Sequence, residues 1–260
     1  MHISLEKKIA LVTGGSGGIG QAIAEALAAS GAHVAITYSS HPEPAQATVK
    51  KIEDGGGKAL AVEADVGDPA AVQSLFDRVE QELGPVDILI NCAGMDGKRA
   101  PSWEIDIADF KKVIDVNLYG TFYCSQLALK SMVARRTGVI LNISSVHETI
   151  AWSGYSAYTA SKAGVSMLTK TMAQEAAPFG VRVLSLAPGA IQTPINEDVW
   201  SDQEQLKDLL GKIPLGRMGQ VADITGLVTV LVSDVGAYVT GTTVFVDGGM
   251  TDYPEFAHGG

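Results

Sequence analysis

Seven short apolar runs recur along the 260-residue chain, and longer segments with helical periodicity separate them. Most of these runs are continuously apolar rather than alternating in polarity, which is typical of strands buried on both faces of a parallel sheet. Repeated strand–helix–strand units favour right-handed crossovers that place helices on both faces of the sheet. The pattern therefore predicts an α/β, doubly wound, seven-stranded parallel sheet, with strands within residues 8–14, 33–38, 58–64, 86–91, 138–144, 181–189 and 242–249.

Two of the predicted helices carry clear boundary signals. The first is expected to end before Gly31, because glycine readily adopts the left-handed conformation that follows a helix. Another is expected to begin after Asp68 as its N-cap, with Pro69 in the first turn, and to end at Gly84. No linker, low-complexity tract or repeat interrupts the pattern, so residues 1–260 are expected to form one domain.

The segment of residues 190–218 breaks the strand–helix rhythm. It contains two prolines and no clear strand pattern. Ligands of open α/β sheets bind at the carboxyl ends of the strands, and an insertion after such an end lies over the ligand crevice. We therefore expect a substrate lid here. The alternative is a surface excursion without a role.

The composition excludes several classes of function. The net charge of −10 argues against binding to nucleic acid or to anionic membranes, since both require basic surface. Cys92 and Cys124 supply neither a disulfide framework nor zinc-ligand spacing, so no metal site is expected. Neither a signal-peptide pattern nor an apolar run of about 20 residues is found. These features fit a cytoplasmic enzyme with a small-molecule substrate, and they also fit many binding proteins.

A glycine-rich loop joins the first strand to the first helix. The segment ALVTGGSGGIGQAIAEAL places glycines at positions 14, 15, 17, 18 and 20. A tight turn there lets the backbone approach a pyrophosphate, and the following helix offers unpaired N–H groups and the positive end of its dipole. This strand–turn–helix context predicts a Rossmann-type dinucleotide site.

The loop reads Thr-Gly-x-x-x-Gly-x-Gly over residues 13–20, and this pattern resembles the short-chain dehydrogenase/reductase family. NCAG at 91–94 is similar to the family's Asn-Asn-Ala-Gly, with Cys92 in place of an asparagine, and Pro188–Gly189 is similar to the start of its nicotinamide-binding segment. The resemblance covers nearly the whole chain and implies an NAD(P)-dependent oxidoreductase. The cofactor-binding residues indicated are Thr13, Gly14, Ser16, Gly18, Ile19, Gly20, Tyr38, Ser39, Ser40, Asp65, Val66, Asn91, Ala93, Gly94, Pro188, Gly189, Ile191 and Thr193.

The end of the second strand bears on the choice between NAD and NADP. A carboxylate at this point accepts hydrogen bonds from the ribose of NAD, whereas an arginine accommodates the 2′-phosphate of NADP. Here Tyr38 is followed by Ser39, Ser40 and His41, so no carboxylate repels a phosphate. Gly17, in contrast, stands where many NADP-preferring relatives carry a basic residue. We expect NADP with dual use of NAD, and the alternative for the serines is an ordinary helix cap.

Tyr158 and Lys162 lie four residues apart, which places them on one face of a predicted helix. A cation there favours the ionised phenol, and the positive nicotinamide of an oxidised cofactor acts in the same direction. Both are expected to bring the tyrosine, with a normal pKa of about 10, into the working range of a base. The resemblance adds Ser145, which would hydrogen-bond the reacting oxygen, and Asn117, which would support a proton-relaying water. It also implies that Lys162 holds the nicotinamide ribose.

The candidate pocket residues combine apolar bodies with polar tips, which suits a hydroxylated substrate. They are Met95, Asp96, His147, Trp152, Tyr155, Asn196 and Tyr253. The alternative for His147 and Trp152 is that they only brace the loop after Ser145, because aromatic bodies often pack while their tips stay in water.

Three motifs indicate a subgroup of the family. SSVHE at 144–148, TPIN at 193–196 and DGGMTDYPEF at 247–256 resemble bacterial glucose 1-dehydrogenases, which oxidise β-D-glucose at C1 with NAD or NADP. A sugar or polyol dehydrogenase is therefore the first hypothesis. The alternatives are a reductase of 3-oxoacyl groups on a carrier protein or of small ketones, and a non-catalytic dinucleotide sensor. The resemblance also implies a homotetramer that pairs two long helices and the last strand between subunits.

Overall fold

The computed structural model describes residues 3–252 and contains one seven-stranded sheet in which every neighbouring pair of strands is parallel. The strand order is β3-β2-β1-β4-β5-β6-β7. This confirms the predicted fold and all seven strand positions. The strands are β1 Ile9–Val12, β2 His33–Tyr38, β3 Lys58–Glu63, β4 Ile88–Asn91, β5 Gly138–Ile143, β6 Val181–Pro188 and β7 Thr243–Val246.

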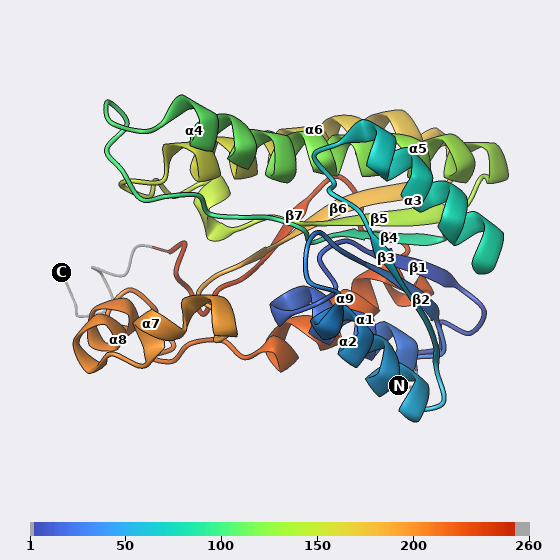
Figure 1. Cartoon of the computed structure of the whole chain (residues 1–260), viewed down its shortest axis with the longest axis horizontal. Helices are drawn as coiled ribbons and strands as arrows, with labels where there is room; N and C mark the ends of the chain where they lie inside the picture. Colours follow the sequence, from blue (N-terminus) through green and yellow to red (C-terminus); the bar gives the residue numbers. More distant parts are fainter. Residues whose placement is uncertain (1–2, 253–260) are drawn as a thin grey trace.

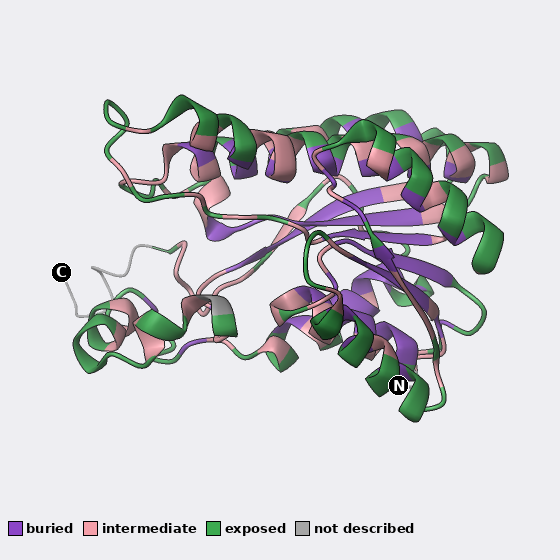
Figure 2. Cartoon of the chain, viewed as in Figure 1, coloured by how far each residue is buried: buried purple, intermediate pink, exposed green. Residues whose placement is uncertain are grey.

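Helices cover both faces of the sheet (Figure 1). One layer contains α1 Gly18–Ala29, α2 Pro42–Asp54 and α9 Val221–Val232. The other contains α3 Pro69–Glu82, α4 Ile107–Ile114, α5 Gly120–Arg135 and α6 Ser156–Ala176. The strands between the layers are largely buried, and the outer helix surfaces are exposed (Figure 2), which explains why the strand sequences are continuously apolar. None of the helices in residues 3–252 is both long and apolar enough to span a bilayer.

The predicted helix boundaries are confirmed. Gly31, just past the end of α1, has φ 98°, and Gly84, just past α3, has φ 114°. The side chain of Asp68 accepts a hydrogen bond from the backbone N–H of Ala70 at 2.9 Å and so caps α3, with Pro69 in its first turn.

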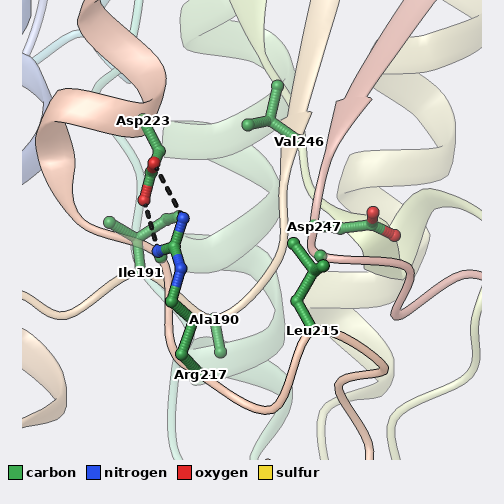
Figure 3. Close-up of a pocket in the computed structure, with 9 residues that line it drawn as sticks. Ala190, Ile191, Leu215, Arg217, Asp223, Val246 and Asp247 are labelled. Atoms are coloured by element: carbon green, nitrogen blue, oxygen red, sulfur yellow. Dashed lines mark hydrogen bonds and ion pairs between the residues drawn. The ribbon is translucent and has the colours of Figure 1, made fainter.

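Residues 190–218 form an excursion that leaves the sheet after β6 (lower left in Figure 1). It contains the 3₁₀ turn Pro194–Asn196 and the short helices α7 Glu197–Trp200 and α8 Gln203–Leu210. Its two ends are joined by a parallel bridge between Ile191 and Gly219. Arg217 and Asp223 form a bidentate ion pair beside this bridge, with N–O distances of 2.7 and 3.0 Å (Figure 3). The backbone bridge and the ion pair therefore hold the two ends of the excursion together.

Candidate active site

The site lies at the carboxyl ends of the paired strands β1 and β4, where the order of the strands reverses. From β1 the chain proceeds through β2 and β3 to one edge of the sheet, and from β4 it proceeds through β5, β6 and β7 to the other edge. This change of direction opens a crevice at the carboxyl ends of the strands, where open α/β sheets bind ligands. The glycine loop follows β1, NCAG follows β4, and Ser145 follows β5.

The glycine loop is closely packed and has no room for a side chain at Gly14, Gly15 or Gly20. Gly14 has φ 65°, and a Cβ on it would lie 2.9 Å from the Cα of Ala93. A Cβ on Gly20 would lie 2.3 Å from the carbonyl oxygen of Gly14. The helix α1 begins at Gly18 without a side-chain cap at Gly17, so its first N–H groups are available to an anion. This geometry fits the pyrophosphate of a dinucleotide.

Two predicted cofactor residues, Thr13 and Asn91, use their side chains inside the protein. The hydroxyl of Thr13 accepts hydrogen bonds from the backbone N–H groups of Cys92 and Ala93 at 3.0 and 3.1 Å. The amide of Asn91 donates to Ser125 and Asn142 at 2.9 and 2.8 Å within the core. The Asn91 amide donors are therefore used within the buried polar network, and cofactor binding at this position stays a prediction. Both residues fix the loop after β4.

Asn117 lies on a π-helical turn, Asp115–Tyr119, between α4 and α5. Its side chain accepts from the N–H of Met95 and donates to the carbonyl of Met95, both at 2.9 Å, and it also donates to Ser161 at 3.0 Å. Asn117 thus clamps the loop after β4 onto α6. A Cβ on Gly94 would lie 3.3 Å from Asn117 Oδ1 and 3.7 Å from Lys162 Nζ, so glycine keeps this corner open.

Ser145, Tyr158 and Lys162 come together as the sequence predicts. Tyr158 and Lys162 lie one turn apart on α6, and Lys162 Nζ is 5.6 Å from the centre of the Tyr158 ring. The buried ammonium of Lys162 donates to the carbonyl of Ile143, the last residue of β5, at 2.9 Å. The side chain of Ser145 hydrogen-bonds the Tyr158 phenol and also accepts from the N–H of His147 at 3.1 Å.

The expected lowering of the Tyr158 pKa does not occur in the protein alone. Burial raises the pKa of Tyr158 to about 12, and the hydrogen bond with Ser145 opposes this rise while the charge of Asp96 adds to it. Burial also lowers the pKa of Lys162. Desolvation disfavours the charged forms of both side chains, and it is the largest cause of each shift. The geometric prediction for this pair is confirmed, and the electrostatic one is wrong for the protein without a cofactor.

Three aromatic pocket candidates form a stack beside Tyr158. The ring of Trp152 stacks on His147 at 4.5 Å and on Tyr155 at 4.0 Å, measured between ring centres. Tyr158 meets His147 and Trp152 edge-on, at 6.2 and 5.9 Å. Nδ1 of His147 is 3.1 Å from the carbonyl of Ile150, and burial lowers the pKa of this histidine. The stack therefore presents a neutral aromatic wall next to the candidate base.

The other pocket candidates are placed differently. Asp96 lies on the loop after β4, close enough to Lys162 and His147 that their charges oppose the rise in its pKa that burial causes. Asn196 is used within the excursion: its side chain accepts from the N–H of Thr193 at 3.0 Å and donates to the carbonyl of Ile191 at 2.9 Å. These bonds fix the turn, and the role of Asn196 as a substrate ligand stays a prediction. Tyr253 lies outside the described residues.

The segment after β2 leaves two serines available for a phosphate. Tyr38 packs partly against the core, whereas Ser39 and Ser40 are exposed. The N-cap of α2 is His41 and has no side-chain cap hydrogen bond. The alternative that the serines cap this helix is therefore wrong. Asp65, one of the predicted cofactor-binding residues, pairs with Lys112 at 2.7 Å, and this bond lowers the pKa of its carboxyl.

Two residues near the site are absent from the sequence-based prediction. Thr37 accepts a hydrogen bond from the N–H of Gly14 at 3.0 Å and so holds the glycine loop to β2. Glu148 accepts from Ser166 of α6 at 2.8 Å. Neither belongs to a motif with fixed spacing. The sequence signal for each is only that a polar residue lies near the end of a buried strand.

Comparisons with known proteins agree with this geometry. A family model described as enoyl-(acyl carrier protein) reductase matches residues 14–251. The chain is 45% identical over 260 residues to 3β-hydroxysteroid dehydrogenase 1 of Eggerthella lenta, covering 100% of this chain and 99% of that protein. It is 41% identical over 256 residues to glucose 1-dehydrogenase 2 of Bacillus subtilis, covering 98% and 99%.

Solved structures lead to the same assignment. A gluconate 5-dehydrogenase from Burkholderia cenocepacia, in complex with NADP and tartrate, superposes with a TM-score of 0.91 at 35% identity, covering 97% of this chain and 98% of that one. A short-chain type dehydrogenase/reductase from Mycobacterium marinum gives 0.90 at 36%, covering 96% and 98%. The chain belongs to the short-chain dehydrogenase/reductase family, whose members are NAD(P)-dependent oxidoreductases.

Proposed function

We propose that the protein transfers hydride between NAD(P) and a CH–OH carbon of a sugar or polyol, with the C1 carbon of an aldose such as glucose as the first candidate. The observation that carries the reaction is the convergence of Ser145, Tyr158 and Lys162 at the end of β5. Relatives described as glucose 1-dehydrogenase and gluconate 5-dehydrogenase support the choice of substrate.

The proposed roles follow from the positions of the side chains. When bound, NAD(P) supplies the carbon that accepts or donates hydride. Tyr158 takes the proton of the alcohol in oxidation and returns it in reduction. Ser145 holds the reacting oxygen, and Lys162 stabilises the phenolate. Because the pKa of Tyr158 is about 12 before the cofactor binds, the phenol is protonated near neutrality.

The aromatic stack supports a ring-shaped substrate. Aromatic side chains pack well against the apolar C–H face of a sugar ring, while their polar tips bond its hydroxyls. The same wall suits the apolar rings of a hydroxysteroid, the substrate named for the Eggerthella relative. A steroid alcohol is therefore the second candidate.

A carrier-protein substrate has less support. Docking an acidic carrier needs a free basic patch, and the adjacent arginines Arg135 and Arg136 are one candidate. Arg135 is paired with Asp87 at 2.7 Å and donates to the carbonyl of Val86. Arg136 lies over the ring of Phe179, 5.8 Å from its centre, and donates to the carbonyl of Pro178.

A panel of substrates tests the proposal. Glucose, gluconate, several polyols, a 3β-hydroxysteroid and an acetoacetyl thioester are each incubated with NAD(H) or NADP(H), and absorbance of the reduced nicotinamide is followed. We expect the highest kcat/KM with a sugar or polyol. A higher value with the steroid or the thioester would contradict the substrate proposal, and no turnover of any alcohol or ketone would contradict the reaction.

We propose that NADP is the preferred cofactor and that NAD is also accepted. Ser39 and Ser40 are exposed donors at the end of β2, and a Cβ on Gly17 would contact nothing within 4 Å. Gly17→Arg is expected to raise the ratio of kcat/KM for NADP to that for NAD by about tenfold, because a guanidinium pairs with the 2′-phosphate. Gly17→Gln adds a long uncharged side chain and is expected to leave the ratio nearly unchanged. If the NADP-to-NAD ratio were equal in both variants, the 2′-phosphate would not lie within reach of a side chain at position 17.

We also propose that residues 190–218 act as the substrate lid and that the protein works as a cytoplasmic homotetramer. The two thiols are free, as expected in a reducing compartment. The outer faces of α5 and α6 expose Phe122 and Met167 and border a groove of about 390 Å³, and the π-helical turn before α5 exposes Tyr119. Light scattering is expected to give four times the chain mass of 27.1 kDa. A monomer at micromolar concentration would exclude this assembly.

A further inference from the structure

We propose that Asp247 is a positioning residue: its carboxylate fixes the turn at Gly248 and Gly249, and this turn holds the exit of the substrate lid, residues 213–215. The inference rests on the proposed function, in which residues 190–218 cover the substrate. Asp247 directly follows the last strand, β7, and has no place in the reaction described above.

The Asp247 carboxylate accepts three hydrogen bonds from the residues that follow it. Its Oδ1 accepts from the N–H of Gly249 at 3.0 Å, and its Oδ2 accepts from both the N–H and the hydroxyl of Thr251 at 2.7 Å. Gly248 and Gly249 have φ 65° and 89°, so the turn contains two left-handed residues in succession. Glycine loses more backbone freedom on ordering than any other residue, and hydrogen bonds to a charged acceptor are among the stronger ones. The carboxylate therefore orders a turn that its own glycines would leave flexible.

The exit of the lid lies directly on this turn. The N–H of Leu215 donates to the carbonyl of Gly248 at 3.0 Å. A Cβ on Gly248 would lie 2.8 Å from Cγ2 of Ile213, which is buried at this point. A Cβ on Gly249 would lie 3.0 Å from Cγ of Pro214. The three residues of the exit are therefore in close contact with the two glycines.

This contact is the main attachment of the outer part of the lid. Among the described residues, the bond to Gly248 is the only hydrogen bond that joins residues 193–216 to the chain outside the excursion. The bridge between Ile191 and Gly219 holds only the base. A cavity of about 200 Å³, lined in part by Leu215 (Figure 3), leaves the packing beside the exit incomplete. The position of the outer lid therefore depends on the turn that the carboxylate fixes.

The backbone of Asp247 makes a separate contact with the predicted cofactor segment. The N–H of Gly189 donates to the carbonyl of Val246 at 3.0 Å, and a Cβ on Gly189 would lie 2.8 Å from the Cα of Asp247. These contacts use backbone atoms, which remain when the side chain is replaced. Loss of the carboxylate is therefore expected to act on the lid and to leave dinucleotide binding in place.

Steady-state kinetics with the best substrate of the panel test this role. Asp247→Ala reduces the population of the lid position seen in the structure, and apparent affinity falls by the same factor as the binding-competent population. The KM for the substrate is expected to rise about tenfold, while kcat and the Kd of the dinucleotide stay within about twofold. Asp247→Asn keeps one acceptor oxygen, and Thr251→Val removes one donor. Each is expected to raise KM by about threefold.

Trypsin cleavage of the enzyme without substrate measures the lid directly. Lys207 and Lys212 are exposed in the outer lid. Cleavage follows the population of the opened form, so its rate after these two lysines is expected to rise about tenfold in Asp247→Ala and to stay unchanged elsewhere in the chain. This measurement decides the inference even if no alcohol or ketone is turned over, an outcome that would contradict only the proposed function.

Asp77→Ala is the matched control. Asp77 is an exposed carboxylate on α3 that accepts a hydrogen bond from the side chain of Gln73 at 2.8 Å, and its loss is expected to change neither KM nor cleavage. Unchanged KM and cleavage in Asp247→Ala would overturn the inference. Equal losses in kcat, substrate affinity and dinucleotide affinity would also overturn it, because they would show general damage rather than an effect on the lid. If Asp247→Ala does not fold, Asp247→Asn and Thr251→Val decide by the same two measurements.

Discussion

Replacement of Tyr158 by phenylalanine is expected to lower kcat by about a thousandfold and to leave dinucleotide affinity unchanged. The substitution removes only the phenolic oxygen. The ring keeps its edge-on contacts with His147 and Trp152, at 6.2 and 5.9 Å, so the aromatic wall is expected to stay in place. The enzyme then lacks the group that moves the alcohol proton. Steady-state kinetics with the best substrate of the panel and a fluorescence titration of the reduced dinucleotide measure the two effects separately.

Tyr238→Phe is the matched control, because Tyr238 is fully exposed and its hydroxyl is far from any proposed chemistry. Its kcat is expected to equal that of the unaltered enzyme. If Tyr158→Phe lost dinucleotide binding together with turnover, the tyrosine would have a structural role. If it kept turnover, Tyr158 would not be the base.

The fold could be predicted because its signal is local and repeated. Each strand is an apolar run of the right length, and each intervening helix has its own start and stop residues, such as Asp68 and Gly84. The candidate site followed from the same signal, because residues at the carboxyl ends of neighbouring parallel strands meet at one edge of the sheet. Ser145 and Tyr158 are 13 positions apart in the sequence and in contact in the structure.

The ionisation of the site could not be predicted from spacing. The separation of Tyr158 and Lys162 on a helix fixes their proximity, but the pKa depends on how completely the surrounding loops remove water. The ammonium also donates to the carbonyl of Ile143 at the end of β5, and this contact is not apparent in the sequence. Before the cofactor binds, burial therefore decides the direction of the Tyr158 shift.

The hydrogen-bond partners of two polar side chains also could not be predicted from the sequence, because they depend on tertiary packing. Asn196 follows a proline in a segment expected to cover the site, which suggests a polar substrate ligand. In the structure its amide bonds Thr193 and Ile191 and closes a local turn. Asn91 belongs to a motif that resembles a cofactor loop, yet its side chain is buried against Asn142 of the next strand. In both cases the sequence does not reveal these hydrogen-bond partners, because they come from neighbouring turns and strands.

Gly20→Ala is expected to weaken dinucleotide binding by about a hundredfold or more, equivalent to about 3 kcal/mol of binding free energy. The added Cβ would lie 2.3 Å from the carbonyl oxygen and 2.9 Å from the carbonyl carbon of Gly14. Both atoms belong to the backbone of the turn that would hold the pyrophosphate, so the turn and the first residues of α1 must move apart. Titration calorimetry with NADPH measures the loss, and thermal unfolding shows whether the sheet remains folded.

Gly17→Ala separates this steric effect from a general intolerance of the loop to side chains. Gly17 has an extended backbone, with φ −168°, and a Cβ there would contact nothing within 4 Å. Its dinucleotide affinity is therefore expected to stay within about twofold of the unaltered enzyme. Equal affinity in Gly20→Ala would mean that the dinucleotide does not depend on the close approach of Gly14 and Gly20. Equal losses of affinity in both variants would mean that the dinucleotide occupies the open space at Gly17. Its phosphate would then lie beside Gly17 at the start of α1 and not beside Gly14 and Gly20.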